Sequence, residues 1–379
     1  MTKSQGVLIC VPLYTISVLF LGASITAGLF VFQVAVVPLI FKYSRTFRRG
    51  LVFANFVQWP LGIDYEDPSA SGIEGGRNIS IEYTSKVDNC PVKIGVWHIL
   101  PKNTYERMKG SFDQSSDKEQ LSASMDRELA NSKTPIIMYC HGNSNSRAAS
   151  HRIRLYKFFQ QMDFHTIAFD YRGYGDSTSL TPTEAGVVED SLMVYEWLEL
   201  ALASGERRPP VFVWGHSLGT GISSHLLGNL NELSVHLLER SAPLPQPNGL
   251  ILEAPFNNIA DEVAEHPLTK LVKWLPYFEH TFVAPFRDEA TCEHRFRSDR
   301  HLARVPSLPL LILHARDDVI VPYVLGHRLY KSVLESRSER DAPVKIHAYD
   351  KKENLGHKWI CSAPDLPQVV GDFVKEHQK

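Results

Sequence analysis

The sequence predicts an α/β fold, in which helices cover both faces of a mostly parallel β-sheet. Short, continuous apolar runs recur along the chain, as expected for strands that are buried on both faces. Stretches with helical periodicity separate most of these runs, for example 152–162 and 184–202. Strands that alternate with helices favour one parallel sheet over a purely antiparallel one.

Length and composition indicate a globular protein. The 379 residues, 44% of them apolar and 22% charged, can bury one large core or two modest ones. The net charge of −2 argues against a nucleic-acid-binding protein, which would have a strong basic excess. The five cysteines are scattered, without the Cys/His clusters of zinc or redox sites, so we expect no metal and no cofactor. Disulfide pairing and oligomeric state are left open.

The N-terminal part predicts a membrane anchor. Val7–Phe41 is a run of 35 residues without a charge, longer than the roughly 20 residues that cross a bilayer. A secretory signal peptide has a shorter apolar core, so we expect a retained span. No polar turn interrupts the run, which favours a single pass over a two-pass hairpin. We therefore predict a short tail at 1–6 and a transmembrane segment at 7–41.

The orientation of this anchor is open from the residues alone. Four basic residues follow the span, and by the positive-inside rule they would place the large domain in the cytosol. They are Lys42, Arg45, Arg48 and Arg49. Asn78 begins an Asn-Ile-Ser glycosylation sequon, which is used only on the lumenal side.

The segment after the anchor predicts a linker and then the edge of a sheet. The chain is turn-rich from 51 to 77, so we predict a linker at 42–76 and the catalytic domain at 77–379. Strands are predicted near 78–83 and 92–100, and the second alternates as antiparallel edge strands do. The polar stretch at 101–133 is expected to be a surface insertion.

Six further strands and a cap complete the prediction of an eight-stranded sheet. The strands are expected at 135–140, 166–170, 211–214, 250–253, 310–314 and 344–349, with a closing helix at 366–377. The segment 257–304 interrupts this rhythm between two core strands and is rich in Pro, Phe, His and Arg. We interpret it as a cap insertion over the site.

A Gly-x-Ser-x-Gly motif follows the strand at 211–214. Its serine is Ser217, between Gly215 and Gly219, and an apolar helical pattern comes next. This strand–turn–helix context is typical of a nucleophile elbow, whose serine lies on a strained turn with its hydroxyl exposed. The two glycines leave room for that turn, and backbone N–H groups at the helix start can hold an oxyanion.

The order of the chain points to partners for this serine. Asp318 follows the strand at 310–314 in a D-x-x-V-P sequence, and we take its neighbour Asp317 as a solvated or loop-capping residue. Only His357 and His377 come after the last predicted strand, and His377 is in the terminal tail. A serine needs a base and the base an orienting acid, so the predicted set is Ser217, Asp318 and His357.

Two further polar motifs are candidates for a catalytic role. A His-Gly-Asn loop follows the strand at 135–140, where it predicts an oxyanion hole made by the N–H groups of Asn143 and Leu218. His165 and Asp170 have the spacing of an acyltransferase signature. A separation of five along a strand puts them on opposite faces, roughly 16 Å apart, so a joint role is not expected.

Several long runs resemble one family. They are GVWHILP, the HGN loop, FDYRGYGDS, VWGHSLGTG, LILEAPFNNI, LLILHARDDVIVP and the GHK of the histidine loop. With them the chain resembles the membrane-anchored lysophosphatidylserine and monoacylglycerol lipases of the α/β-hydrolase-domain family. The resemblance implies an α/β-hydrolase fold and an endoplasmic-reticulum membrane protein with a lumenal, often glycosylated domain, which favours use of Asn78. The short tail before the span departs from the longer tails of the mammalian relatives.

The predicted activity is hydrolysis of the single acyl ester of a lysolipid. The same residues would also serve a thioesterase or a peptidase, because a fold does not fix the substrate. A non-catalytic interaction protein is less favoured, since all three predicted residues are present. Arg147 and Arg152 follow the oxyanion loop and are candidate contacts for a phosphate head group, with a solvated helix face as the alternative.

Overall fold

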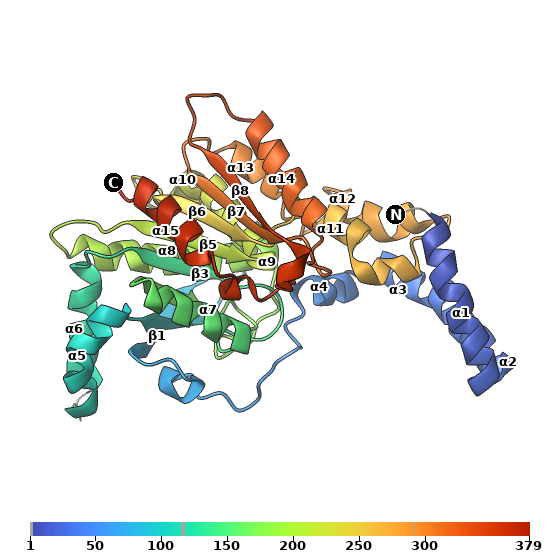
Figure 1. The fold of residues 1–379 in the computed structure, drawn as a ribbon, viewed down its shortest axis with the longest axis horizontal. Helices are drawn as coiled ribbons and strands as arrows, with labels where there is room; N and C mark the ends of the chain where they lie inside the picture. The colour runs from blue at the N-terminus through green and yellow to red at the C-terminus, as the bar shows by residue number, and fades with distance from the viewer. Residues whose placement is uncertain (1–2, 115–117, 291) are drawn as a thin grey trace.

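The computed structural model describes residues 3–114, 118–290 and 292–379 (Figure 1). Its centre is an eight-stranded sheet in the order β1-β2-β4-β3-β5-β6-β7-β8. Strand β2 is antiparallel to both β1 and β4, and all other neighbours are parallel. The strands are β1 (Gly76–Thr84), β2 (Pro91–Ile99), β3 (Ile136–Cys140), β4 (His165–Phe169), β5 (Val211–His216), β6 (Gly249–Glu253), β7 (Leu310–Ala315) and β8 (Val344–Tyr349). The predicted α/β-hydrolase fold is confirmed.

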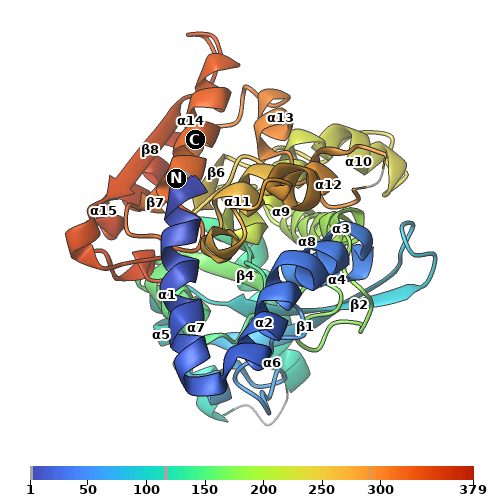
Figure 2. The same cartoon turned by 90° about the vertical axis from the view of Figure 1, so that its right-hand side faces the viewer.

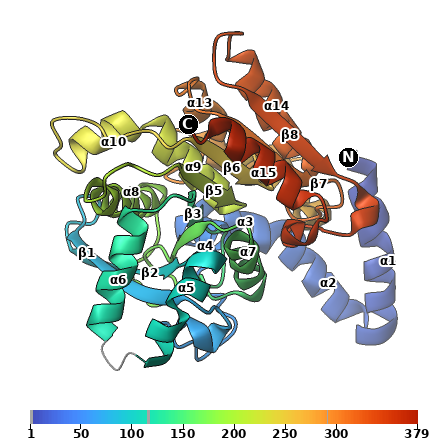
Figure 3. The same cartoon turned by 60° about the vertical axis from the view of Figure 1, so that its left-hand side comes forward.

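Helices cover both faces of the sheet (Figure 3). Helices α8, α9 and α14 pack on one face, and α7 and α15 on the other. Strand β3 shows why its residues are continuously apolar: Ile136, Met138 and Cys140 join the first core, whereas Ile137 and Tyr139 join the second. The helices are α7 (Ser150–Gln161), α8 (Glu184–Ala203), α9 (Leu218–Gly228), α10 (Leu230–His236), α14 (Tyr323–Glu335) and α15 (Leu366–His377).

The predicted surface insertion forms helices α5 (Lys102–Gln114) and α6 (Lys118–Ala130). Leu121, Met125 and Leu129 follow one another at helical spacing, and the last two are fully buried. This apolar stripe holds α6 against the domain, so the polar composition of the segment describes only its outer face.

The N-terminal apolar run differs from our expectation of one uninterrupted span. It folds into two antiparallel helices, α1 (Lys3–Leu21) and α2 (Ala23–Val31), which project from the domain as a hairpin (Figures 1 and 2). The chain reverses at Gly22, which has a φ of 81°, a region that suits glycine. Thr26 Oγ1 donates to Ser17 Oγ across the two helices at 3.2 Å. The absence of a polar turn favoured a single pass, but the reversal at Gly22 and this hydrogen bond between the two arms form a hairpin without one.

The second arm of this hairpin is the candidate membrane span. Helix α2 continues through the π-helical turn η1 (Phe32–Val36) into α3 (Val37–Tyr43). Among the residues that the structure describes, Ala23–Tyr43 is the one helix long and apolar enough to cross a bilayer. Its 21 residues have a mean hydropathy of 2.1 and rise over about 30 Å. This is consistent with a single-pass membrane protein.

The predicted linker and cap contain short helices near one edge of the sheet. In the linker, α4 (Arg45–Phe53) ends at the fully buried Phe53, and the turn η2 (Pro68–Ser71) precedes β1. The cap comprises α11 (Ile259–Glu265), η3 (Pro267–Leu271), η4 (Glu279–Val283), α12 (Ala284–Arg287) and α13 (Ser298–Ala303). Two 3-10 turns, η5 (Lys351–Glu353) and η6 (Ile360–Ser362), flank the histidine loop. The domain boundaries remain predictions.

Candidate active site

Ser217 lies on a strained turn between β5 and α9. Its backbone has φ 52° and ψ −118°, which is uncommon for a residue other than glycine. Its N–H donates to the carbonyl of Glu253 at 3.0 Å, so the neighbouring strand holds the turn in place. The residue is 7% exposed and borders a cavity. These are the features expected of a nucleophile elbow.

The two glycines of the elbow are required by close approach. A Cβ on Gly219 would lie 2.0 Å from the carbonyl oxygen of Cys140, and one on Gly215 would lie 2.5 Å from Ser223 Oγ. A side chain on Gly219 would push the start of α9 away from β3, and one on Gly215 would push α9 away from β5. Close approach of neighbouring atoms therefore explains why glycines flank Ser217.

Asp318 and His357 are brought together at the carboxyl end of the sheet. Asp318 follows β7, and its Oδ2 accepts a hydrogen bond from His357 Nδ1 at 2.8 Å. Its Oδ1 accepts from the backbone N–H groups of Ile320 and Val321 at 2.8 and 2.9 Å. The carboxylate is buried, so these bonds fix both of its oxygens.

Electrostatics keep Asp318 ionised. Burial raises the pKa of its carboxyl, but the neighbouring His357 and His314 outweigh that effect and hold the pKa below its ordinary value. His314 Nε2 lies 3.5 Å from Asp318 Oδ2 and 2.9 Å from the carbonyl of Val321. A buried carboxylate of this kind can orient an imidazole and stabilise its protonated form.

Asp317 and His216 act on the histidine loop rather than on the acid. Asp317 Oδ2 accepts a hydrogen bond from the N–H of Gly356 at 3.0 Å, which agrees with its expected loop-capping role. His216 Nε2 donates to the carbonyl of His357 at 2.9 Å. Burial, followed by the proximity of His357, lowers the pKa of His216 well below its ordinary value and keeps this ring neutral.

The elbow is linked to the histidine loop through His216. His216 precedes Ser217 in the chain and contacts the histidine loop, so the elbow and His357 share one edge of the sheet. The structure contains no hydrogen bond between Ser217 Oγ and His357 Nε2. Such bonds are often long in unliganded enzymes and tighten when substrate binds.

The predicted oxyanion donors lie on the same side of the sheet. Asn143 and Leu218 both line the cavity beside Ser217. Among the described residues, neither backbone N–H has an acceptor elsewhere in the fold, so both can serve a ligand. The loop is held from outside, since Ser144 N donates to the carbonyl of Phe53 at 3.1 Å and Asn143 Nδ2 to that of Val52 at 3.2 Å.

The structure places Arg147 and Arg152 behind the oxyanion loop and not on a solvated helix face, and it does not favour them as contacts for a phosphate head group. Both side chains are buried. The Arg147 guanidinium pairs with Asp170 at 2.6 Å and Asp176 at 2.5 Å. Arg152 donates to backbone carbonyls of the oxyanion loop, including that of Ser146 at 2.6 Å. Their terminal guanidinium nitrogens are used by these partners, and within the part of the chain that the structure describes only the buried Nε of each side chain has no acceptor. These contacts hold the oxyanion loop from behind.

The remaining candidate residues, His165, Asp170 and Asn78, have structural partners. His165 contacts His98 at 3.0 Å, whereas Asp170 pairs with Arg147, so the two do not form a joint site. The Asn78 amide is also occupied: its Nδ2 donates to Glu66, and its Oδ1 accepts from Arg147, both at 3.0 Å. A glycan would replace one of the two hydrogens on Nδ2 and leave the other for Glu66, so use of this sequon stays a prediction.

A cavity of about 740 Å³ opens beside the elbow. This volume is in the range of about 300–1,000 Å³ that is typical of ligand pockets. Asn143, Ser217 and Leu218 lie on its wall, and most other lining residues are apolar. Glu262 of the cap is the one carboxyl group on the described wall. Burial, and secondly Asp318, raise the pKa of Glu262 to about 8.

Three segments form the wall of this cavity. The cap was expected over the site, but the N-terminal hairpin and α4, which were not predicted to take part, also contribute walls. Helix α4 offers Phe47, Leu51 and Val52, and its amphipathic pattern is a signal that was available in the sequence. No sequence signal paired the hairpin with the cap.

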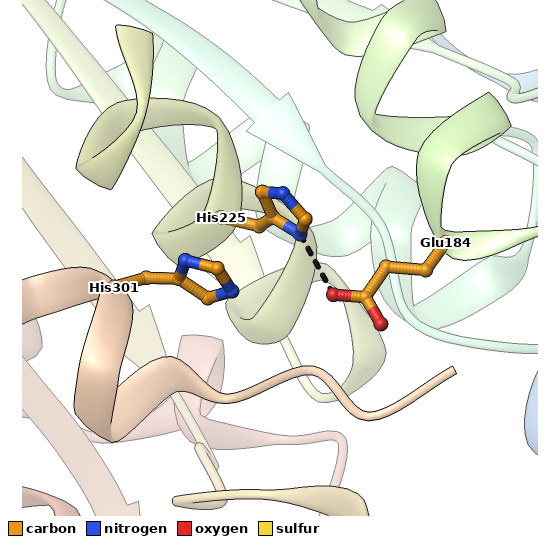
Figure 4. Close-up of side chains that lie close together, drawn as sticks. All are labelled: Glu184, His225 and His301. Atoms are coloured by element: carbon orange, nitrogen blue, oxygen red, sulfur yellow. Dashed lines mark hydrogen bonds and ion pairs between the residues drawn. The ribbon is translucent and has the colours of Figure 1, made fainter. Parts of the chain in front are cut away.

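A Glu/His/His cluster lies elsewhere, where α8, α9 and α13 meet (Figure 4). Ligand atoms of Glu184, His225 and His301 are within 4.8 Å of one another. Glu184 already accepts from His225 Nδ1 at 2.7 Å and from two backbone N–H groups. The two imidazole rings stack 4.1 Å apart at 18°, so their in-plane lone pairs run side by side rather than converge. We interpret the cluster as a structural link that fixes the end of the cap.

Comparison with known proteins identifies the family. The profile of the alpha/beta hydrolase fold matches residues 135–248. Lysophosphatidylserine lipase ABHD12 from Rattus norvegicus is 36% identical over 89% of this chain and 76% of its own length. The Danio rerio protein of the same name is 33% identical over 89% and 80%, and Protein ABHD12B from Homo sapiens is 32% identical over 86% and 80%. The chain belongs to the ABHD12 family of α/β hydrolases.

Solved structures agree with this fold at greater evolutionary distance. The Pyrococcus furiosus esterase Pf2001 superposes with a TM-score of 0.54 at 19% identity, covering 85% of this chain and 98% of the esterase. An alpha-beta hydrolase from Vibrio vulnificus gives 0.53 at 12% identity, covering 87% and 91%. At these identities the likeness establishes the fold alone. Membership of the ABHD12 family therefore rests on the sequence relatives, and it makes the chain a hydrolase.

Proposed function

We propose that this protein is a serine lipase that hydrolyses the acyl ester of lysophospholipids, with lysophosphatidylserine favoured, and of monoacylglycerols. The observation that carries the proposal is one cavity that has Ser217 on its wall and an apolar chamber beyond it. A single-chain lipid fits such a chamber with its ester at the serine. The names of the curated relatives support lysophosphatidylserine as a substrate.

The mechanism assigns one task to each group of the site. The Ser217 hydroxyl attacks the ester carbonyl while His357 Nε2 takes its proton, and Asp318 stabilises the resulting imidazolium. The N–H groups of Asn143 and Leu218 hold the oxyanion. The imidazolium then protonates the departing glycerol oxygen, which leaves an acyl-enzyme. A water molecule activated by His357 attacks that ester, and the fatty acid leaves as Ser217 regains its proton.

The competing activities fit the cavity less well. A peptide substrate needs partners for its backbone N–H and carbonyl groups, and the described wall is mostly apolar. A thioester of a long acyl chain would fit the chamber, but the curated relatives are named as lipases of a lysophospholipid. A purely structural role gives no reason for the strained Ser217 backbone or for the buried pair of Asp318 and His357.

We further propose a single-pass protein of the endoplasmic-reticulum membrane with its catalytic domain in the lumen. The apolar helix Ala23–Tyr43 supports the span, and the resemblance to membrane-anchored lipases supports the compartment and side. A tag after Lys379 provides the test in sealed microsomes. Protection of the tag from added protease is expected, and digestion without detergent would place the domain in the cytosol. This test does not depend on Asn78.

A fluorophosphonate probe tests the chemistry directly. The wild-type protein should be labelled on Ser217, and Ser217→Ala should lose both the label and about 10⁴- to 10⁶-fold of kcat on lysophosphatidylserine. The neighbouring Ser223→Ala is the matched control and should keep both. A wild-type protein that resists the probe and hydrolyses no acyl ester would contradict the proposal.

A further inference from the structure

The hairpin helix presents one face to the cavity. Leu29, Gln33, Val37 and Phe41 recur every four residues along Ala23–Tyr43, and all four line the cavity that contains Ser217. Residues at this spacing lie on one side of a helix. Other apolar residues of the same helix, such as Val36, do not line the cavity and are exposed. The helix therefore has a cavity face and a separate outer face.

Specific contacts hold this face against the cap. Gln33 Nε2 donates to the carbonyl of Leu271 at 2.5 Å. This polar side chain of the apolar span thus bonds to a cap residue 238 positions further along the chain. Lys42 Nζ lies 2.8 Å from His280 Nε2. The ring of Phe41 packs on that of Phe282 with centroids 4.7 Å apart. A helix that only tethered the domain would need none of these contacts.

The outer rim of the cavity is apolar and accessible. Leu268 of the cap is 68% exposed, and Phe47 and Leu51 of α4 are 39% and 46% exposed, although all three also line the cavity. Exposed apolar surface beside a membrane span is suited to contact lipid. An apolar surface thus continues from the outside of the hairpin to the wall that bears Ser217.

We propose that the hairpin forms a wall of the acyl-chain site, and that the acyl chain of a lysolipid passes from the bilayer to Ser217 between the hairpin and the cap. The ligand is a long, unbranched fatty acyl chain. Along this path it leaves the apolar interior of the bilayer and contacts the apolar wall of the cavity without crossing water. This inference rests on the proposed lipase function and extends it. It makes the anchor part of the substrate site.

Neighbouring valines give a matched test in the full-length protein in lipid nanodiscs. Val37→Trp adds bulk to the cavity face, whereas Val36→Trp adds the same bulk to the outer face. The readout is kcat/KM for octadecenoyl lysophosphatidylserine divided by kcat/KM for a butyryl ester. Val37→Trp should lower this ratio by about tenfold or more, and Val36→Trp should leave it unchanged.

A second pair protects the test against a variant that fails to fold. Leu29 also lines the cavity, about two turns closer to the hairpin tip, and Leu39 does not line it. Leu29→Trp should reduce hydrolysis of the longest acyl chains only, while Val37→Trp should also reduce that of intermediate ones. Labelling of each variant with a short-chain fluorophosphonate reports whether Ser217 is still reactive.

Crosslinking locates the chain directly. A fluorophosphonate with a diazirine at the end of a long alkyl chain is attached to Ser217 and irradiated, and the crosslinked peptide is mapped. A crosslink within residues 10–43 is expected, and one confined to the cap would overturn the inference. Equal ratios for Val36→Trp, Val37→Trp and wild type would also overturn it. In both cases probe labelling of the wild type would leave the proposed lipase function intact.

Discussion

The sheet-edge site and the lipid cavity are built in opposite ways. At the edge, backbone hydrogen bonds position the proposed catalytic residues: Ser217 N donates to the carbonyl of Glu253, and two amides hold Asp318. The cavity is assembled from the hairpin, α4 and the cap, which are far apart in sequence and joined mainly by apolar contacts. We call the sheet-edge site the rigid region, because backbone hydrogen bonds fix the positions of its groups. Substrate selection depends instead on how the hairpin, α4 and the cap meet.

Adjacent aspartates provide the sharpest test of the rigid region. Asp318→Asn should lower kcat by about 10⁴-fold, because the amide no longer orients His357 or stabilises its charged form. Asp317→Asn should cause a much smaller loss, since Asp317 only accepts from Gly356 N. Rates are measured with a short-chain ester, so that the cavity does not contribute. A greater loss in Asp317→Asn would mean that the acid was assigned to the wrong residue.

Two glycines contrast the packing of the two regions. Gly219→Ala should destabilise the fold by about 3 kcal/mol or more and abolish probe labelling, because the new Cβ would lie 2.0 Å from a backbone carbonyl. Gly28 in the hairpin has no atom within 4 Å of its Cβ position, so Gly28→Ala should change stability by at most about 1 kcal/mol. Thermal unfolding in detergent measures both. Equal stability changes in Gly219→Ala and Gly28→Ala would contradict the difference in packing between the elbow and the hairpin.

The rigid region was predictable because its signals are local. The strand predicted at 344–349 has the bounds of β8, and the order of Ser217, Asp318 and His357 along the chain led to groups that share one sheet edge. Ser217 and Asp318 come close behind β5 and β7, so predicting those strands also placed these two residues, whereas His357 was placed by its position in the loop after β8. Small residues around Ser217 follow from the same local geometry.

The cavity was not predictable because its determinants are pairwise and distant. A lone Gly22 does not specify a hairpin, and the contacts that do, such as Thr26 with Ser17, depend on both arms at once. The contact between Gln33 and Leu271 spans 238 positions. Arg147 illustrates the same limit, since its sequence neighbours give no sign of the buried Asp170 that it pairs with.

A buried carboxyl tests the electrostatics of the rigid region. Burial, and secondly Asp318, raise the pKa of Glu253 to about 8, while Trp214 Nε1 donates to its Oε2 at 2.9 Å. The unfolded chain ionises this group above about pH 4.3, but the folded chain does so only near pH 8. Its contribution to stability is therefore greatest below about pH 4.3 and falls by at most about 1.4 kcal/mol per pH unit up to about pH 8.

Glu253→Gln should remove this pH dependence, because an amide cannot ionise. The variant should match the wild type in unfolding free energy near pH 4.5 and exceed it at pH 8, as measured by denaturant unfolding at both values. The exposed Glu82→Gln is the control and should show no such trend. A wild-type advantage at pH 8 would show that the Glu253 carboxylate is stabilised by the fold.

The smallest expected effect concerns Glu262 in the cavity. Its pKa of about 8 keeps the wall uncharged at neutral pH, and ionisation above pH 8 places a charge beside the acyl chain. The KM for a long-chain lysolipid should rise several-fold between pH 7 and pH 9 relative to that for a butyryl ester, and Glu262→Gln should remove that rise. Glu265→Gln lies on the same helix outside the cavity and should behave as wild type. Any pH effect on the proposed catalytic residues changes KM for both esters and drops out of their ratio. A rise in the KM ratio that persists in Glu262→Gln would therefore show that Glu262 does not cause it.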